Sequence, residues 1–303
     1  MKVLLTGANG QVGWEIVRRA TNHQLLVLTH RELDITHSQV VQHTVKESGA
    51  DIVINAAAYT AVDQAEQEPD MAFAVNRDGP ANLAATCAQL GIPLLHLSTD
   101  YVFDGSKAGA YYEDDPVAPL GVYGDSKWQG EESVRQRLAA HLILRVSWIF
   151  GSHGRNFVKT MLRLAKERKQ LRVVADQYGC PTYAGDIADV VLRLAERVVQ
   201  DSSFGAISGK NKNSYWGTYH YCGVPATTWH GFAKTIIDIG RMHSPLQVEE
   251  IVPISTIDYP TPAARPVNSV LACQQLQERF AIKPCPWRDG LEATLRMIAA
   301  ESL

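Results

Sequence analysis

The sequence carries little net charge and has no long apolar run. Its 303 residues include 29 Lys and Arg against 32 Asp and Glu, so the formal net charge is −3, and both signs are interspersed. No basic surface for nucleic acid or for an anionic membrane is indicated, although a local cluster of cations could still bind a small anion. Residues 1–5 are too short for a signal-peptide core, and no stretch could cross a bilayer. We expect a soluble, cytoplasmic protein that binds neither nucleic acid nor membrane.

Cysteine is also scarce. The five cysteines are odd in number and widely scattered, none forms a Cys-x-x-Cys pair, and no His-rich metal spacing accompanies them. They are Cys87, Cys180, Cys222, Cys273 and Cys285. This pattern predicts reduced, mostly buried thiols and argues against a disulfide scaffold or a zinc site.

Short apolar runs alternate with helical patterns in the first half of the chain. Such alternation is typical of βαβ units on a parallel sheet. The predicted strands are 3–5, 25–28, 51–55, 93–97 and 142–146, and the predicted helices are about 11–21, 38–48, 69–90 and 126–139. We therefore predict an α/β fold in which residues 1–148 form a Rossmann-like, doubly wound parallel sheet.

The pattern changes after Trp148. Residues 156–169 form an amphipathic helical pattern, proline-rich connections follow at 259–262 and 284–286, and 209–214 is a polar loop. One face of the amphipathic pattern carries Phe157, Met161, Leu164 and Ala165. The length suggests about two domains. We predict a smaller, irregular α/β substrate domain over residues 149–303, some segments of which return to the first domain.

Glycines spaced G-x-x-G-x-x-G follow the first predicted strand and open a helix. At Gly7, Gly10 and Gly13 the backbone could turn tightly and approach a pyrophosphate, while the helix N-terminus presents free N–H groups. A purely structural turn is the alternative. The spacing resembles that of short-chain dehydrogenases, so we predict a nicotinamide dinucleotide site that includes Gln11 and Val12.

Arg31 follows the second predicted strand, where an NAD-specific site would carry an acidic residue for the ribose 2′-hydroxyl. A guanidinium there could pair with a 2′-phosphate through two hydrogen bonds. The alternative is an exposed loop arginine. Asp34 and Ile35 could flank the adenine. We therefore predict NADPH as the cofactor, with NADH as the second candidate.

Ala56, Ala57 and Ala58 follow the third predicted strand. Small residues at the carboxyl end of a sheet let a ligand lie against the backbone, although they also serve close packing. We include them in the predicted cofactor site.

Tyr123 and Lys127 are four residues apart, which places both on one face of a helix. A neighbouring ammonium lowers the pKa of a phenol from its usual value near 10. Thr99 follows a predicted strand about 25 residues earlier. The three side chains together supply an acid, its activator and a hydrogen-bonding partner for a carbonyl oxygen, which predicts redox chemistry at a carbonyl.

Longer motifs resemble those of one family of nucleotide-sugar enzymes. Residues 98–105 resemble its S-T-D-Y-V-F-D-G signature, and residues 119–127 resemble its P-x-x-x-Y-G-x-x-K block. Further matching segments are 63–66, 145–148, 156–161, 176–182 and 259–269. From Lys2 to about Trp287 the chain is similar to the dTDP-4-dehydrorhamnose reductases of the extended short-chain dehydrogenase/reductase superfamily.

The resemblance implies reduction of the C4 ketone of dTDP-4-dehydro-β-L-rhamnose to dTDP-L-rhamnose, in polysaccharide precursor synthesis. It implies that Tyr123 donates the proton, that Lys127 holds the nicotinamide ribose and lowers the Tyr123 pKa, and that Thr99 polarises the ketone oxygen. The implied substrate contacts are Thr99, Phe103, Tyr123, Trp148, Asn156 and Arg265, the last for the diphosphate.

The sequence departs from the family pattern at two places. Ala264 replaces the first of two adjacent arginines, which leaves Arg265 alone for the diphosphate. Some members are homodimers with Mg²⁺ between glutamates, and Glu15 is present here. Gly185 and Asp186 stand where a second glutamate is expected. We therefore predict no metal site, with Glu15 as the one candidate ligand, and leave the homodimer open.

Two other functions share these motifs. Epimerases and dehydratases of the same superfamily hold NAD as an internal redox carrier, and Arg31 argues against them. A regulatory subunit of methionine adenosyltransferase also resembles the family without catalysing this reaction. The joint presence of Thr99, Tyr123 and Lys127 favours an enzyme.

Overall fold

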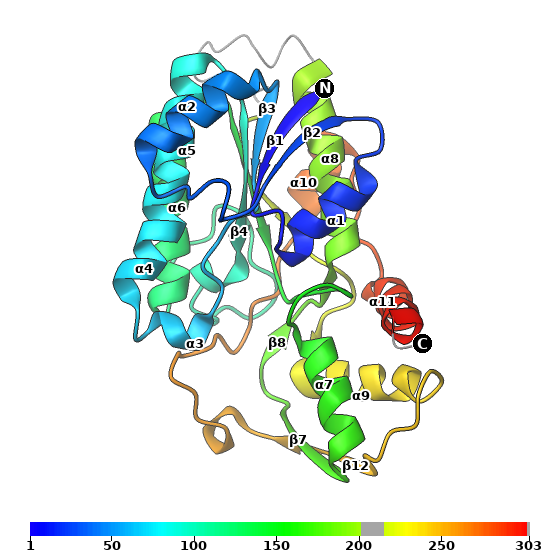
Figure 1. The fold of residues 1–303 in the computed structure, drawn as a ribbon. Helices are drawn as coiled ribbons and strands as arrows, with labels where there is room; N and C mark the ends of the chain where they lie inside the picture. The colour runs from blue at the N-terminus through cyan, green and yellow to red at the C-terminus, as the bar shows by residue number, and fades with distance from the viewer. Residues whose placement is uncertain (201–214, 302–303) are drawn as a thin grey trace.

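A six-stranded parallel sheet forms the centre of the molecule (Figure 1). The computed structural model describes residues 1–200 and 215–301. The strand order is β10-β5-β4-β3-β1-β2, and every neighbouring pair is parallel. The strands are β1 (Lys2–Thr6), β2 (Gln24–Leu28), β3 (Ile52–Asn55), β4 (Leu94–Thr99), β5 (His141–Val146) and β10 (Gly217–Tyr221). The predicted Rossmann-like, doubly wound sheet is confirmed.

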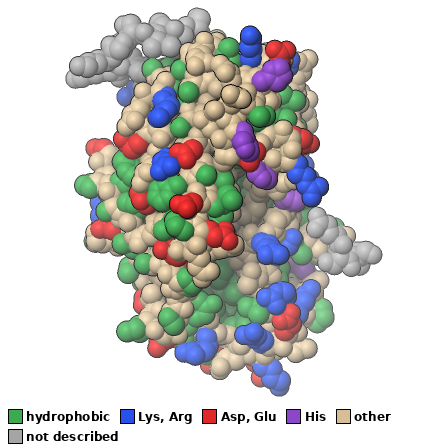
Figure 2. All heavy atoms as spheres, turned by 60° about the vertical axis from the view of Figure 1, so that its left-hand side comes forward, with side chains coloured by type: hydrophobic (Ala, Val, Ile, Leu, Met, Phe, Trp, Pro, Cys, Tyr) green, Lys and Arg blue, Asp and Glu red, His purple; other side chains and the backbone are tan. Residues whose placement is uncertain are grey.

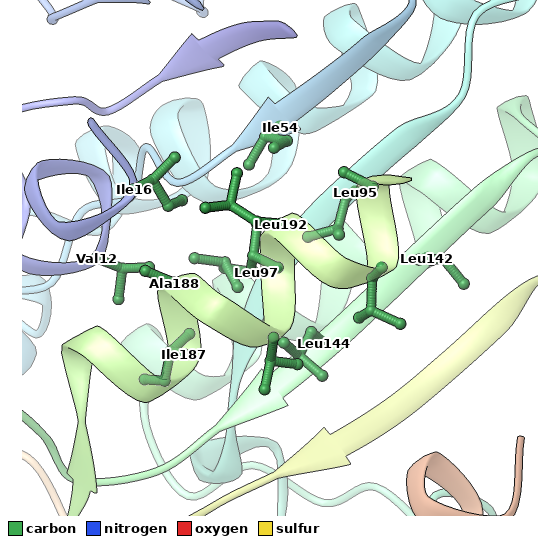
Figure 3. Close-up of a cluster of buried hydrophobic side chains, with 14 of the residues drawn as sticks. Val12, Ile16, Ile54, Leu95, Leu97, Leu142, Leu144, Ile187, Ala188 and Leu192 are labelled. Carbon is green, nitrogen blue, oxygen red and sulfur yellow. The ribbon is translucent and has the colours of Figure 1, made fainter. Parts of the chain in front are cut away.

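Helices cover both faces of this sheet. They are α1 (Gln11–Arg19), α2 (Ser38–Ser48), α5 (Gly79–Leu90), α6 (Val122–Arg137) and α8 (Ala184–Gln200). Side chains alternate across each strand, so Val3 and Leu5 of β1 pack with α1 and α8, whereas Leu4 packs in the cluster of α2, α5 and α6. Figure 3 shows the first cluster, in which Ile54, Leu95 and Leu97 of the strands lie around Leu192 of α8. Burial on both faces explains why these strands are apolar almost throughout.

The helix predicted over 69–90 contains a π-helical turn. Pro69–Phe73 (α4), the turn Ala74–Asp78 and α5 follow one another directly. Asn76 in this turn is buried, accepts a hydrogen bond from the Tyr59 N–H (2.9 Å) and donates one to the Ser126 hydroxyl (3.0 Å). The turn therefore ties the loop after β3 to α6.

A smaller part of the molecule lies beyond the carboxyl ends of the strands (Figure 1). It contains α7 (Phe157–Glu167), α9 (Trp229–Gly240), α11 (Trp287–Glu301) and the parallel pair β7 (Gln170–Val174) and β12 (Glu250–Ile254). Its core is a separate cluster around Phe150, Phe232 and Trp287. The predicted amphipathic helix is α7, but Phe157 and Leu164 are only partly buried in it because they line the cavity described below.

Several segments of the second half return to the sheet. β10 pairs with β5, α8 packs against α1, and α10 (Gln274–Phe280) contacts β10. The domain division at residue 148 stays a prediction, and the predicted polar loop 209–214 lies outside the described residues.

No helix in the described part of the chain is long and apolar enough to span a bilayer. All five cysteines are free, and all except Cys285 are buried, as the spacing of the cysteines predicted.

Candidate active site

The three glycines form a tight turn between β1 and α1. Gly7 has φ +71°, and a Cβ there would lie 2.3 Å from the backbone N of Ala57. A Cβ on Gly13 would lie 2.3 Å from the Gly7 carbonyl oxygen, which accepts a hydrogen bond from the Gly10 N–H (3.0 Å). The turn sets the N-terminus of α1 where the strand order reverses between β1 and β3. A dinucleotide pyrophosphate binds at such a position, so these residues fit the predicted cofactor.

Gln11 and Val12 open α1 and face different surroundings. Val12 is buried in the core, so its backbone is the part available to a ligand. The Gln11 side-chain oxygen accepts a hydrogen bond from Asn156 Nδ2 (2.9 Å), and His153 Nε2 lies 3.0 Å from the Asn9 carbonyl oxygen. The segment 151–156 therefore lies against the glycine turn and joins the smaller part of the molecule to it.

Asn156 was expected to contact the substrate, but its side chain is engaged within the protein. Its oxygen accepts a hydrogen bond from the Lys159 N–H (3.1 Å) at the start of α7, and its nitrogen donates to the Gly151 carbonyl oxygen (2.8 Å) as well as to Gln11. In this arrangement Asn156 caps α7 and fixes the segment over the glycine turn.

The turn after β2 carries Arg31 beside Glu32, and both are exposed. The Glu32 carboxylate accepts hydrogen bonds from the Thr29 N–H (2.6 Å) and the Thr29 hydroxyl, which hold it at the end of β2. Asp34 is half-buried, and Ile35 is buried. The sequence-based prediction did not include Glu32, although an acid about 20 residues after the glycines is the signal for recognition of a ribose hydroxyl.

The alanines after β3 form a fixed loop. Ala56, Ala57 and Ala58 are all half-buried. The Asn55 side-chain oxygen accepts hydrogen bonds from the Thr6 hydroxyl (2.7 Å) and from the Ala57 N–H (3.1 Å). This loop therefore stays close to the end of β1, beside the glycine turn.

Thr99, Tyr123 and Lys127 meet at the carboxyl end of β4. Thr99 is the last residue of β4, and Tyr123 and Lys127 lie one turn apart near the start of α6. The Thr99 hydroxyl lies beside the phenol of Tyr123 and lowers its pKa. Lys127 is buried, and its ammonium donates to the Leu97 carbonyl oxygen (2.7 Å). The structure thus brings together the three residues expected to act on a carbonyl.

The pKa of Tyr123 is raised to about 12, opposite in sign to the lowering expected from Lys127. Burial of the phenol is the main cause, the Thr99 hydroxyl acts against it, and the charge of Asp100 raises the pKa further. Burial also lowers the pKa of Lys127 to about 8, against the opposing charge of Glu131. Tyr123 therefore keeps its proton at neutral pH.

A buried ion pair lies behind Lys127. Glu131 and Arg145, from α6 and β5, have side chains 0% and 1% exposed. Arg145 donates to both carboxylate oxygens (2.9 and 2.7 Å), and Ser98 and Arg135 donate to them too. Burial raises the pKa of Glu131, but these donors outweigh it and hold the pKa at about 2. The prediction missed this pair, although an arginine in the otherwise apolar strand 142–146 was a signal.

A cavity of about 670 Å³ opens beside Tyr101, whose ring packs edge-on against the ring of Tyr123 at 5.8 Å. Its lining combines aromatic and charged side chains, among them Asp63, Phe157, Arg168, Arg172, Trp229, Tyr259 and Arg265. Figure 2 shows a face of the molecule that is hollowed near its middle, with Lys and Arg side chains beside and below the hollow. A cavity of this size and charge suits an anionic ligand that carries flat rings.

Arg265 lines this cavity directly, whereas Trp148 contacts the lining residue Trp229. The Arg265 guanidinium lines it and pairs with both carboxylate oxygens of Asp63 (2.9 and 2.7 Å). Trp148 stacks on Trp229, with ring centroids 3.5 Å apart, and has φ +45°. Non-glycine residues rarely adopt this conformation, and it occurs often at functional sites. Trp148 acts on the cavity through Trp229.

The structure does not bring Phe103 to this cavity. Phe103 is fully buried, its ring stacks on Tyr111 at 4.2 Å, and the Arg145 guanidinium lies over it at 5.1 Å. The 3-10 turn Asp100–Val102 separates it from Thr99 and directs it into the core. Phe103 is therefore a core residue and not the substrate contact that was expected.

Glu15 is held by neighbours within the chain. Its carboxylate is 1% exposed and accepts hydrogen bonds from Arg19 Nε (3.0 Å) and the Tyr183 hydroxyl (3.3 Å). Across residues 1–200 and 215–301 no three His, Cys, Asp or Glu side chains cluster as metal ligands would. The absence of a metal site stays a prediction.

Comparison with known proteins places this geometry in one family. The model of the RmlD substrate binding domain matches residues 1–300. The dTDP-4-dehydrorhamnose reductase of Burkholderia thailandensis is 42% identical over 305 residues, covering 99% of this chain and 100% of that protein.

Solved structures agree. The dTDP-4-dehydrorhamnose reductase of Clostridium acetobutylicum has a TM-score of 0.88 at 35% identity, and the one of Bacillus anthracis, solved in complex with NADP, has a TM-score of 0.87 at 36% identity. Each comparison covers 98% of this chain and 99% of the other. With the glycine turn, the Thr99–Tyr123–Lys127 cluster and the basic cavity in place, this chain belongs to the dTDP-4-dehydrorhamnose reductase family.

Proposed function

We propose that this protein reduces the C4 ketone of dTDP-4-dehydro-β-L-rhamnose to dTDP-L-rhamnose with NADPH. The observation that carries the proposal is the meeting of Thr99, Tyr123 and Lys127 beside a cavity lined by aromatic and basic side chains. Relatives that match over nearly the full chain bear the name of this activity, and one of them was solved with NADP.

The glycine turn and the alanine loop would hold the cofactor, with the N-terminus of α1 toward the pyrophosphate. Lys127 would hold the nicotinamide ribose. Arg31 would pair with the 2′-phosphate, and the neighbouring Glu32 could accept a hydrogen bond from the ribose of NADH, which supports NADH as a second substrate. When bound, NADPH supplies the hydride that reduces the ketone.

Tyr123 would donate its proton to the ketone oxygen. Its raised pKa keeps the phenol protonated at neutral pH, so the proton is in place when the ketone oxygen takes it up. Thr99 would hydrogen-bond to the same oxygen and stabilise the charge that develops on it. These two hydroxyls therefore act on one atom of the substrate.

The cavity would hold the nucleotide and its diphosphate. Arg265, Arg168 and Arg172 supply positive charge, and Phe157 and Trp229 supply flat surfaces for rings. Asp63 restrains Arg265 by two hydrogen bonds, which orients the guanidinium before the substrate binds. The free thiols of all five cysteines fit a cytoplasmic enzyme.

Purified protein, NADPH and dTDP-4-dehydro-L-rhamnose generated in situ test the proposal through the loss of NADPH absorbance. We expect turnover by the wild type and a loss of at least about 10²-fold in Tyr123→Phe. Tyr112→Phe, at an exposed tyrosine away from the site, is the matched control and should keep full activity. Parallel assays with NADH measure the cofactor preference.

A folded wild type that binds NADPH but oxidises none of it with this sugar would contradict the proposal. Copurified, tightly held NAD would then favour an epimerase or a dehydratase, because those enzymes share the glycine turn and the Tyr-x-x-x-Lys motif. Inactivity toward a range of nucleotide-sugar ketones would favour a regulatory subunit.

A further inference from the structure

A second buried carboxyl group lies beside the reacting residues and has no assigned role. Asp100 follows Thr99 directly, begins the 3-10 turn and is 2% exposed. Its Oδ1 accepts a hydrogen bond from the Thr99 hydroxyl (3.1 Å). Its Oδ2 is buried with no hydrogen-bond partner among the described residues. An ionised carboxylate in such surroundings is costly, so the site favours the neutral acid.

The groups that face Asp100 are mostly hydroxyls. Thr99 comes from β4, Tyr123 from α6 and Tyr101 from the 3-10 turn itself. Ser269 lowers the pKa of Asp100, although its hydroxyl makes no hydrogen bond with Oδ2 in ordinary geometry. The charged pair Arg265 and Asp63 acts on the neighbouring Tyr101. Burial outweighs the hydrogen bonds and raises the pKa of Asp100 to about 7.

The hydroxyl of Thr99 donates a hydrogen bond to Asp100 and lies beside the phenol of Tyr123, whose pKa it lowers. Thr99 Oγ1 accepts a hydrogen bond from the Tyr101 N–H (3.2 Å), which leaves this oxygen one more lone pair and one proton of its own. When Asp100 is neutral, its O–H can donate to that lone pair, and the Thr99 proton is then free to point at Tyr123. When Asp100 is ionised, the Thr99 proton is drawn to Oδ1 instead.

We propose that Asp100 is a proton reservoir that restores Tyr123 through the hydroxyl of Thr99. This inference rests on the proposed function. After Tyr123 has given its proton to the substrate oxygen, the tyrosinate takes the proton of the Thr99 hydroxyl, and Thr99 takes the proton of the Asp100 carboxyl. One O–H bond breaks and one forms at each transfer, so the product gains one proton and Asp100 becomes a carboxylate. Solvent returns a proton to Asp100 before the next turnover.

The direction of transfer follows from the two acids. Because Tyr123 has a pKa of about 12 and Asp100 one of about 7, a proton moves downhill from the carboxyl group to the tyrosinate. Of these two acids only Asp100 changes its protonation near neutral pH, and it does so below Lys127, whose pKa is about 8. Turnover should therefore fall as the pH rises through about 7, because Asp100 loses its proton there.

Asp100→Asn tests the reservoir, since the amide keeps the shape of the side chain but holds no transferable proton. We expect kcat to fall about ten-fold or more, with KM and NADPH binding unchanged and the loss of activity near pH 7 removed. Thr99→Val, which breaks the connection, should also remove that pH limb, whereas Thr99→Ser should restore it. A purely structural role of Asp100 would leave the pH dependence in place.

Infrared titration provides a readout that needs no turnover. A carbonyl-stretch band of a protonated carboxylic acid should be present at pH 6, disappear as the pH rises through about 7, and be missing in Asp100→Asn. If no band at pH 6 depends on Asp100, the reservoir is overturned whatever the substrate. If the wild type turns over and Asp100→Asn keeps its pH limb, the reservoir fails while the proposed reaction stands. Failure of wild-type turnover instead removes the proposed reaction.

Discussion

Glu131→Gln removes one charge from the buried pair behind Lys127 and keeps the size of the side chain. Arg145 now donates to both carboxylate oxygens, and a glutamine offers only one oxygen in their place. The amide nitrogen would face a guanidinium that also has only donors. The variant therefore leaves the charge of Arg145 buried without its counter-ion.

The pKa of Glu131 gives the size of the effect. It falls from an ordinary 4.5 to about 2, which at 1.36 kcal/mol per pH unit corresponds to about 3 kcal/mol of folding stability at pH 7. Breaking a buried pair by removing one partner typically costs about 3–5 kcal/mol, which agrees. At the lower end of roughly 2–4 °C per kcal/mol, Tm should fall by about 6 °C.

Thermal and urea unfolding at several pH values measure this loss. Because the folded-state pKa lies below the unfolded one, the contribution of Glu131 is complete above pH 4.5 and declines as the pH falls toward 2. The gap between wild type and variant should therefore be full at pH 7 and narrow in acid. Glu132→Gln is the matched control, because that neighbour is 39% exposed and pairs only with Arg135 among the described residues, so its loss should cost less than about 1 kcal/mol. Equal destabilisation by the two variants would refute the reasoning.

Three further substitutions give expected outcomes. Gly7→Ala should lower stability by more than about 1 kcal/mol and abolish NADPH binding in a fluorescence titration, because its Cβ would collide with the backbone of Ala57; normal binding would show that the turn can relax. Arg31→Ala should raise the KM for NADPH about ten-fold, as expected for loss of about 1.4 kcal/mol of binding free energy, and leave the KM for NADH unchanged. Equal effects on the two KM values would show that Arg31 does not bind the 2′-phosphate. Phe103→Leu should reduce Tm but leave the KM for the sugar nucleotide unchanged, since Phe103 lies in the core; a raised KM with unaltered Tm would restore it as a substrate contact.

The main elements of the sheet could be predicted because their signals are local. Strands buried on both faces appear as short apolar runs, and the helix Ser38–Ser48 has the bounds that its pattern indicated. The π-helical turn in the helix over 69–90 has no such signal. It depends on hydrogen bonds from Asn76 to Tyr59 and Ser126, which are distant in sequence.

The part of the site that could be predicted from the sequence is likewise the part with local sequence signals. Glycine spacing and the Tyr123–Lys127 interval are local, and the structure brings these residues to one edge of the sheet. Phe103 lies only four residues from Thr99, but a turn between them reverses its direction. The arginines of the cavity come from separate segments, so Arg168 and Arg172 could not be assigned to a common surface from spacing alone.

The two buried carboxyl groups at the reacting residues differ because of what faces them. Glu131 receives hydrogen bonds from two arginines and a serine, so its pKa falls to about 2 and it stays charged. Asp100 has one oxygen without a partner in the described part of the chain, and its pKa rises to about 7. Where the environments of two carboxyl groups shift their pKa values in opposite directions, one group commonly stays charged and the other carries a proton. A fixed negative charge near Lys127 favours its ammonium, whereas a fixed charge at Asp100 would oppose the tyrosinate that Tyr123 must become. A neutral Asp100 removes that opposition at the moment when Tyr123 gives up its proton, which is why the position next to Thr99 suits a carboxyl group that can be neutral at the pH of the reaction.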